Sequence, residues 1–296
     1  MSIVILVIGI LIAGISGGAD LYSDYRLTSA KSLTQNSRVS RVDSLEMWVE
    51  STQDGAFSNL VSTAPISYNF IKKPDNKQPI AKWNNVKIAQ NINSDVDPYQ
   101  TISDRQPFYT ESAINGLPAL YFDGKTDGTG DFLSFKAKFI NDYSNFTIFI
   151  VEKRTNFAVK SQWGFGPYQY ILSTTDFTDG LAVGPVLNGY IRIIPGSFYQ
   201  IGNYLDKTYL HTFLIDENLG KKIYLNGVQK LSVADVIRPR VPNDNLMKIA
   251  YFDRSWAQDY YTGFIGEIII FSKALNNSER SDVEKYLLKK WAINLN

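Results

Sequence analysis

The sequence contains no cysteine and only one histidine, His211. Without cysteine, the chain cannot form a disulfide framework, a zinc ribbon or a thiol nucleophile. A single histidine excludes a cage of several imidazole ligands around a metal ion, and it leaves one imidazole as a base for nucleophilic catalysis. His211 lies in the strand-like run 208–215, and we interpret it as a structural residue.

The sequence also lacks an excess of charge of either sign. Thirty Lys and Arg residues against 29 Asp and Glu residues give a formal net charge of +1. Such a protein has no extended field to attract nucleic acid or anionic lipid, so we expect no nucleic-acid partner. The hydrophobic fraction of 44% and the charged fraction of 20% are typical of globular proteins. A chain of 296 residues can form one large β domain with an appendage, or two ordinary domains.

Charged residues are absent from the first 19 positions, since Asp20 is the first of them. A helix over these residues would span about 28 Å, close to the hydrocarbon thickness of a bilayer, so the segment is predicted to insert into a membrane. A buried core helix would not need apolar residues on every face. A cleaved secretory signal would need basic residues at its start, and no Lys or Arg precedes Ile3. The stretch Asp20–Asn36 contains no proline and continues the helical pattern.

The run Ser2–Gly14, with the sequence SIVILVIGILIAG, closely resembles the N-terminal helix of type IV pilins and pseudopilins. In that family a prepilin peptidase removes a short basic leader, and a Glu lies just before the apolar run. Both features are missing here, so we expect Met1 to be a misassigned start, which the upstream DNA would reveal. The resemblance implies as partners other copies of the chain or other pilin subunits, bound through the apolar helix, and an inner-membrane assembly machinery.

The remainder of the chain has the pattern of a β protein. After a polar linker, Arg38–Ser44, short runs rich in aromatic and β-branched residues alternate with Asn-Gly and Asp-Gly turns, which predicts an antiparallel sandwich or barrel. The pair Asn226-Gly227 favours a two-residue hairpin loop between 222–225 and 228–231. Near the C-terminus the pattern becomes helical, and a helix over Asn277–Trp291 is predicted, with Asn276 as its N-cap.

Four segments in this order resemble the laminin-G-like, concanavalin A-like jelly roll of bacterial surface proteins. They are Leu45–Glu50, Gln106–Gly124, Lys222–Val228 and Gly263–Leu275, the last followed by the C-terminal helix. The resemblance implies a mainly β fold, an antiparallel β-sandwich with a long N-terminal α-helix and a short C-terminal helix. We therefore divide the chain into an apolar helix with its polar extension, residues 1–37, and a sandwich domain, residues 38–296.

The same fold occurs in glucanases, which use two carboxylates at alternating positions of one strand. Glu267 is the nearest candidate, but three isoleucines follow it where further acids would be required. No Gly-rich phosphate loop of the nucleotide-binding type is present either. We therefore expect no enzymatic activity, and a glycoside hydrolase is the last of the alternatives.

Two binding sites are candidates on residue type alone. Asp123, Asp127 and Asp131 lie in a Gly-rich loop whose carboxylates would suit Ca²⁺, although Asp-Gly pairs are equally typical of plain turns. Aromatic residues in two expected loops would suit glycans if their rings are exposed, and core burial is the alternative. These residues are Trp163, Tyr168, Trp256 and Tyr260.

The function predicted from these patterns is that of a pilin-like subunit, in a type IV pilus or pseudopilus, that displays a lectin-like sandwich for adhesion or filament assembly. Its expected location is the bacterial inner membrane, with one span and the domain outside the cytoplasm, or an extracellular filament. The alternative is a signal-anchored carbohydrate-binding surface protein outside any filament. An upstream prepilin leader would favour the pilin.

Overall fold

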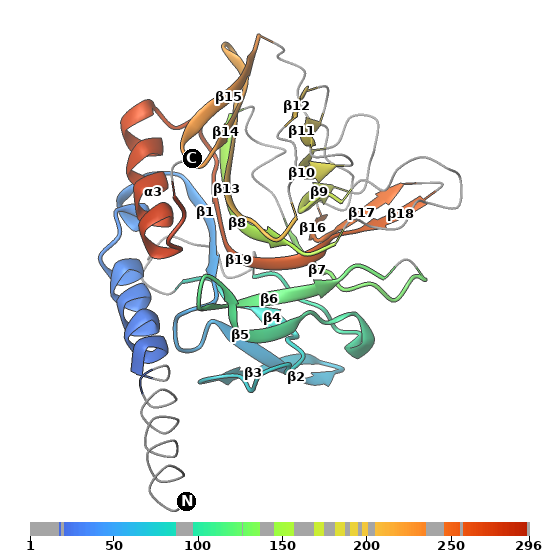
Figure 1. Ribbon diagram of the computed structural model, residues 1–296. Coiled ribbons are helices and arrows are strands. Elements are labelled where there is room, and N and C mark those ends of the chain that lie inside the picture. The colour runs from blue at the N-terminus through green and yellow to red at the C-terminus, as the bar shows by residue number, and fades with distance from the viewer. Residues whose placement is uncertain are drawn as a thin grey trace, which may run out of the picture.

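The computed structural model in Figure 1 describes most of the chain. The described residues are 18, 21–86, 97–125, 127–136, 145–156, 169–174, 181–186, 190–194, 197–200, 205–234, 246–254 and 257–294. Apart from Gly18, the uncharged segment 1–19 lies outside them, and so do Trp163, Tyr168 and Trp256. Among the described residues no helix combines the length and the apolarity that a membrane span requires, which contradicts the predicted single-pass location in the inner membrane.

The strands form two main sheets and two small ones, and every strand pairing is antiparallel. The large sheet has the order β15 (Val228–Val233), β14 (Gly220–Leu225), β13 (Thr208–Asp216), β8 (Phe146–Arg154), β19 (Thr262–Phe271), β6 (Leu117–Asp123) and β5 (Phe108–Ile114), with β1 (Leu45–Glu50) paired to β19. The second sheet has the order β12 (Ser197–Gln200), β11 (Tyr190–Ile194), β10 (Ala182–Val186), β9 (Leu172–Thr174), β16 (Leu246–Ile249) and β7 (Leu133–Lys136). The small sheets are β17 (Tyr251–Arg254) with β18 (Ala257–Tyr260), and β3 (Ile66–Ile71) with β2 (Phe57–Thr63) and β4 (Lys82–Trp83). The predicted antiparallel β-sandwich is therefore confirmed.

The large sheet is buried on both faces, as the alternation along β8 shows. Phe146, Ile148 and Ile150 belong to the core cluster between the two main sheets. Phe149 and Val151 point to the opposite face and belong to a second cluster, under the helices. Because successive side chains of a strand point to opposite faces, a strand buried on both sides reads as a continuous apolar run.

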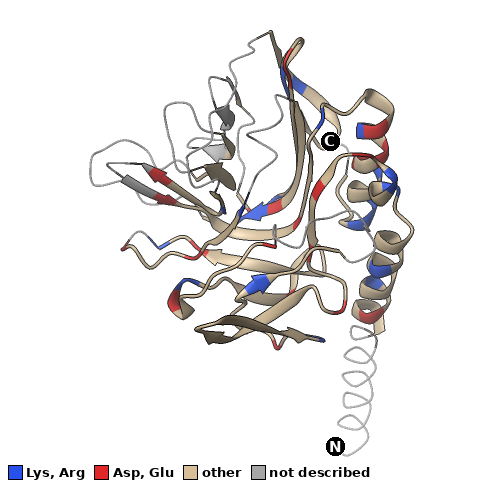
Figure 2. Ribbon diagram, turned by 180° about the vertical axis from the view of Figure 1, so that it is seen from behind, with Lys and Arg blue, Asp and Glu red and all other residues tan. Residues whose placement is uncertain are grey.

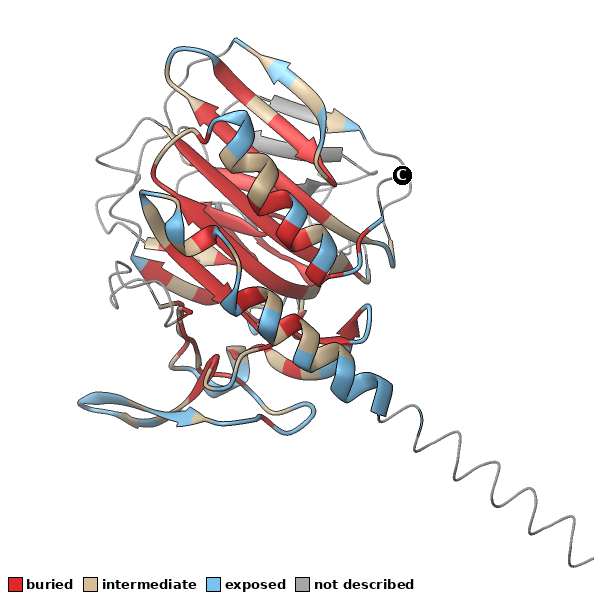
Figure 3. Ribbon diagram, turned by 90° about the vertical axis from the view of Figure 1, so that its left-hand side faces the viewer, coloured by how far each residue is buried: buried red, intermediate tan, exposed pale blue. Residues whose placement is uncertain are grey.

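Two helices cover the outer face of the large sheet (Figure 3). Helix α3 spans Asn277–Lys290 and begins with a capping box, in which Asn276 and Glu279 bind each other's backbone N–H groups. Val283 and Leu287 of this helix are buried in the second cluster. The C-terminal helix and its N-cap are therefore as predicted.

In the N-terminal helix, the described residues 21–35 are exposed at the start of this stretch and packed against the domain at its end. Leu21 is 75% exposed, whereas Ala30 and Thr34 are buried, and the Thr34 hydroxyl lies 3.0 Å from the Tyr286 hydroxyl of α3. The predicted linker contains a 3₁₀ helix, η1 (Val39–Arg41), whose Val39 is buried. A second 3₁₀ helix, η3 (Ser103–Arg105), precedes β5. Residues on both sides of position 37 thus pack in the same cluster under the helices.

Candidate functional site

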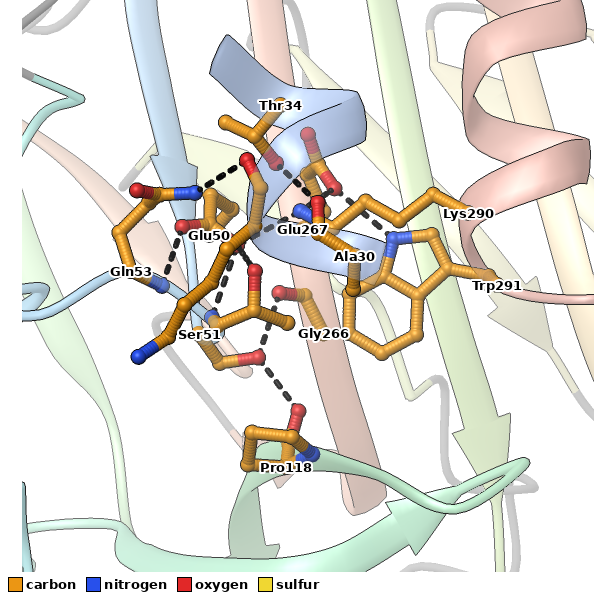
Figure 4. Close-up of polar contacts among 12 residues, drawn as sticks. Ala30, Thr34, Glu50, Ser51, Gln53, Pro118, Gly266, Glu267, Lys290 and Trp291 are labelled. Carbon is orange, nitrogen blue, oxygen red and sulfur yellow. Dashed lines mark hydrogen bonds and ion pairs between the residues drawn. The ribbon is translucent and has the colours of Figure 1, made fainter. Parts of the chain in front are cut away.

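Glu50 and Glu267 form the centre of a buried polar cluster beneath the two helices (Figure 4). They are paired directly across β1 and β19 and are 0% and 1% exposed. The Lys290 ammonium of α3 lies 2.6 Å from a carboxylate oxygen of Glu50 and 2.9 Å from one of Glu267. A single cation therefore serves two buried carboxylates.

The remaining acceptor sites of Glu267 are filled by ring groups. The Trp48 indole N–H and the Tyr286 hydroxyl each donate to Oε1 at 2.7 Å, and the Trp291 indole N–H donates to Oε2 at 2.8 Å. Glu50 is held in a similar way by the backbone and hydroxyl of Thr52, at 2.8 and 2.6 Å. The Gln53 N–H donates to the other Glu50 oxygen at 2.8 Å, so all four carboxylate oxygens are bonded. With both carboxylates at most 1% exposed, the cluster joins β1, β19 and α3 and offers nothing to a substrate.

A second buried cluster lies between the main sheets. The Glu152 carboxylate of β8 accepts a hydrogen bond from the Tyr261 hydroxyl at 2.5 Å, and its other oxygen lies 2.8 Å from Nε2 of His211. All three residues are 0% exposed. Burial, and then the charge of Glu152, raise the pKa of Tyr261 well above its usual value, so this hydroxyl keeps its proton.

The three aspartates of the predicted calcium loop do not converge. Asp123 and Asp131 accept hydrogen bonds from each other's backbone N–H groups, at 3.2 and 3.0 Å. Asp127 instead accepts from the backbone and hydroxyl of Thr129, at 2.9 and 2.5 Å, as in a simple Asx turn. In the described part of the chain no group of three or more such side chains could hold a metal ion.

Asp131 is nevertheless unusual. Burial, reinforced by the neighbouring Asp123 carboxylate, raises the pKa of Asp131 to about 8. The Lys125 ammonium lies 2.7 Å from Asp123 and leaves Asp131 without a cation of its own. At neutral pH the Asp131 carboxyl is therefore largely protonated, which suits its place in a turn rather than at a cation.

Of the aromatic candidates, only Tyr260 lies among the described residues. Its side chain is 0% exposed and packs against Tyr251 with the ring centroids 4.6 Å apart. It presents no ring face to solvent, so the expectation of an exposed sugar platform is not met there. Trp163, Tyr168 and Trp256 stay predictions.

A polar pocket of about 580 Å³ opens at the end of the sandwich where β13 begins, and we call it the end pocket. Such a volume is in the range of small-molecule sites, roughly 300–1,000 Å³. Its walls come from six separate parts of the chain, among them the end of β8, the β14–β15 hairpin and the C-terminal residues. The residues that determine its chemistry are Lys153, Tyr199, Asp206, Lys207, Tyr209 and Lys230.

Two asparagines hold the C-terminal wall of the end pocket in place. Asn115 and Asn226 both adopt left-handed backbone angles in hairpin loops, with φ of 49° and 50°. The Asn115 amide donates to the Trp291 carbonyl at 2.8 Å, and the Asn226 amide donates to the Asn294 carbonyl at 3.5 Å. The Asn-Gly pairs, predicted as turn residues alone, therefore also line the pocket. The sequence pattern could not have pointed to this role, because the residues after the C-terminal helix that the two asparagines bind are distant in the sequence.

The hairpin and the turn that line the end pocket are also held in place by hydrogen bonds. The Asn226 side chain accepts a hydrogen bond from the backbone N–H of Leu210 at 2.9 Å, which ties the hairpin to β13. The turn before β13 is bound to the end of β8, because the Asp206 N–H donates to the Arg154 carbonyl at 2.8 Å. The pocket is thus built on strand ends and bonded turns.

The pocket has a local excess of positive charge. Its described lining includes three lysines, Lys153, Lys207 and Lys230, and one carboxylate residue, Asp206. Elsewhere in the described structure basic and acidic residues are interspersed, as Figure 2 shows along both helices. The end pocket therefore differs in charge from the two helices.

Comparisons with known proteins give matches among solved structures only. No protein-family model and no curated protein matches the chain. The sialidase of Trypanosoma rangeli in complex with 2,3-difluoro-KDN is 11% identical, with a TM-score of 0.52 over 84% of this chain and 33% of the sialidase. The same enzyme as a covalent intermediate with 2,3-difluorosialic acid matches to the same extent. Domain 4 of a GH43 extracellular arabinanase from Geobacillus stearothermophilus, in complex with arabinotriose, is 13% identical, with a TM-score of 0.44 over 60% of this chain and 81% of that domain.

At this identity the likeness to the sialidase establishes the fold, and the chain spans about a third of the sialidase's length. It contradicts the predicted function, because the matched protein is a sialidase and not a pilin. The prediction of a pilus or pseudopilus subunit is therefore wrong. The prediction that the protein is not an enzyme no longer stands either, since an enzyme carries this fold.

Proposed function

We propose that this chain binds carbohydrate in the end pocket. The observation that carries the proposal is the pocket itself, about 580 Å³ in volume and lined by charged and amide groups together with Tyr199 and Tyr209. Saccharides present many hydroxyl groups, which such polar side chains bind, and apolar C–H faces, which aromatic rings cover. The support from fold is that the sialidase sharing this sandwich was solved with sialic acid analogues.

The protonation of Tyr209 and the partial burial of both tyrosine rings suit carbohydrate binding. Burial raises the pKa of Tyr209, and the Glu152 charge raises it further, so its hydroxyl is a neutral donor at physiological pH. Tyr209 is half-buried against the core, which fixes its ring. Tyr199 is half-buried at the end of β12 and lies on another wall of the pocket. A ligand can therefore meet two rings on a preorganised surface.

The test is a glycan array probed with the full-length chain and with two variants, Tyr199→Ala and Asn294→Trp. The first removes a ring, and the second fills the pocket from an exposed C-terminal position without touching the core. Tyr22→Ala is the matched control, because Tyr22 is 67% exposed on the N-terminal helix. We expect both pocket variants to lose binding while melting like the wild type. Binding that survives in both would place the carbohydrate site elsewhere.

A second candidate is hydrolysis of a glycosidic bond, and one observation favours it. The Tyr261 hydroxyl and the Glu152 carboxylate form a bonded pair at 2.5 Å, and sialidases use a tyrosine nucleophile. Against it, both side chains are fully buried and the pKa of Tyr261 is raised, so substrate access and deprotonation would both be needed.

This candidate is tested by incubating the full-length chain with a fluorogenic sialoside. Release of the fluorophore by the wild type and its loss in Glu152→Gln, at unchanged glycan binding, would support hydrolysis. No release by the wild type would remove the candidate and leave binding in the end pocket untouched.

A further inference from the structure

The charge of the end pocket bears on which carbohydrates it accepts. Its three lysines come from three places, the end of β8, the turn before β13 and strand β15. None of them forms an ion pair within the part of the chain that the structure describes. Other described lysines commonly do, such as Lys82 with Asp97 at 2.8 Å and Lys273 with Glu279 at 2.7 Å.

Ammonium groups that line one pocket repel each other, and an anion bound in that pocket relieves the repulsion. Among the described residues that line the pocket, Asp206 is the one acidic residue, and it lies in an exposed turn. Lys153 and Lys230 are half-buried, so their charges are less screened by solvent than those of fully exposed lysines. The pocket is thus complementary to a ligand of negative charge.

We infer that the carbohydrate bound in the end pocket is acidic, a saccharide with a carboxylate or sulfate group that the three lysines receive. The inference rests on the proposed carbohydrate binding and adds the chemical class of the ligand. The tyrosines and amides would contact the neutral part of the saccharide, and the ammonium groups its acidic substituent. Lysine acts as a point charge, so carboxylate and sulfate are both suitable.

The test is calorimetric titration of the full-length chain with 3′-sialyllactose, lactose 3′-sulfate and lactose. We expect both acidic sugars to bind about tenfold or more tightly than lactose, because hydrogen bonds to charged groups are the stronger ones. The difference should shrink when sodium chloride is raised from about 50 mM to about 500 mM, since salt screens it. A higher affinity for one of the two acidic sugars shows whether the pocket prefers a carboxylate or a sulfate.

The decisive variant is the double substitution Lys207→Gln and Lys230→Gln. It should remove most of the preference for acidic sugars, so that these bind little more tightly than lactose, whereas Lys72→Gln, at an exposed position that does not line the pocket, should keep the full preference. Equal affinity for all three sugars, still lost in Asn294→Trp, would overturn the acidic class and leave the proposed function standing. Failure to bind any glycan on the array or in titration would overturn both.

Discussion

Glu50 and Glu267 face each other across β1 and β19 and share the single ammonium of Lys290. Glu267 follows Gly266, at which the register of β19 shifts, and the bulge brings its carboxylate under α3. The contact also fixes the C-terminal helix, which in turn leads to the residues that wall the end pocket. A change in the cluster is therefore expected to act on stability first and on the pocket through the helix.

Removing the shared cation tests the energetic role of this cluster. Lys290→Met leaves two buried carboxylates without their shared cation and should lower the free energy of unfolding by about 3–5 kcal/mol. Lys289→Met is the matched control on the exposed side of the same turn, with an effect within about 0.5 kcal/mol. Urea denaturation of the three proteins measures both. Similar midpoints for Lys290→Met and the wild type would show that the ion pair contributes nothing.

Gly266 is a second sensitive position, because a Cβ there would lie 2.4 Å from the Trp291 ring. Gly266→Ala must displace that ring, and we expect a loss of about 1–3 kcal/mol, as for other overpacked sites. The displacement should appear as a change in near-ultraviolet circular dichroism, since Trp291 is fully buried. Gly18→Ala, with nothing within 4 Å, is the control. An unchanged spectrum for Gly266→Ala would argue against the packing of Trp291 on the bulge.

The pKa of Asp131, raised to about 8, predicts a particular pH dependence. Between about pH 4 and pH 8 the unfolded chain loses the proton of this carboxyl and the folded chain keeps it. Stability therefore falls as the pH rises through this window, by at most about 1.4 kcal/mol per pH unit, and is level above it. Asp131→Asn should remove this slope and be more stable than the wild type at pH 8.

Denaturation at pH 5 and pH 8 measures the effect, with Asp127→Asn as the contrasting variant. The hydrogen bonds from Thr129 lower the pKa of Asp127, so its contribution is present at neutral pH and is lost only as the pH falls through its folded value. A stability difference between wild type and Asp131→Asn that is the same at both pH values would contradict the buried, protonated carboxyl.

Local structure was predictable from sequence, and distant convergence was not. The capping box at Asn276 and the hairpin at Asn226 each depend on residues only a few positions apart in the sequence, so both can be predicted from local sequence patterns. The glucanase pattern places a second carboxylate on the same strand as Glu267, whereas in the structure the second carboxylate is Glu50 of the neighbouring strand. The end pocket needs six separate parts of the chain to meet, and no periodicity encodes that.

The predicted pilin function illustrates the same limit. That prediction depends on the uncharged segment, residues 1–19. Such a segment indicates packing in a membrane or a filament, but it does not indicate what the sandwich domain binds. The antiparallel β structure was predictable from strand pattern and turn chemistry, and the resemblance to a jelly roll gave the sandwich. The proposed function depends instead on the end pocket, whose lining brings Lys153 and Lys230 together from distant parts of the sequence.

The most direct test of carbohydrate binding in the end pocket is to map a bound glycan on the protein by amide chemical-shift changes. The full-length chain, labelled with ¹⁵N, would be titrated with the tightest-binding glycan from the array. If the glycan binds in the end pocket, the largest changes fall at Lys153, Lys207 and Tyr209, with none at Phe70 of the exposed β3 strand. Changes that leave the walls of the end pocket unaffected and appear elsewhere would contradict binding in the end pocket.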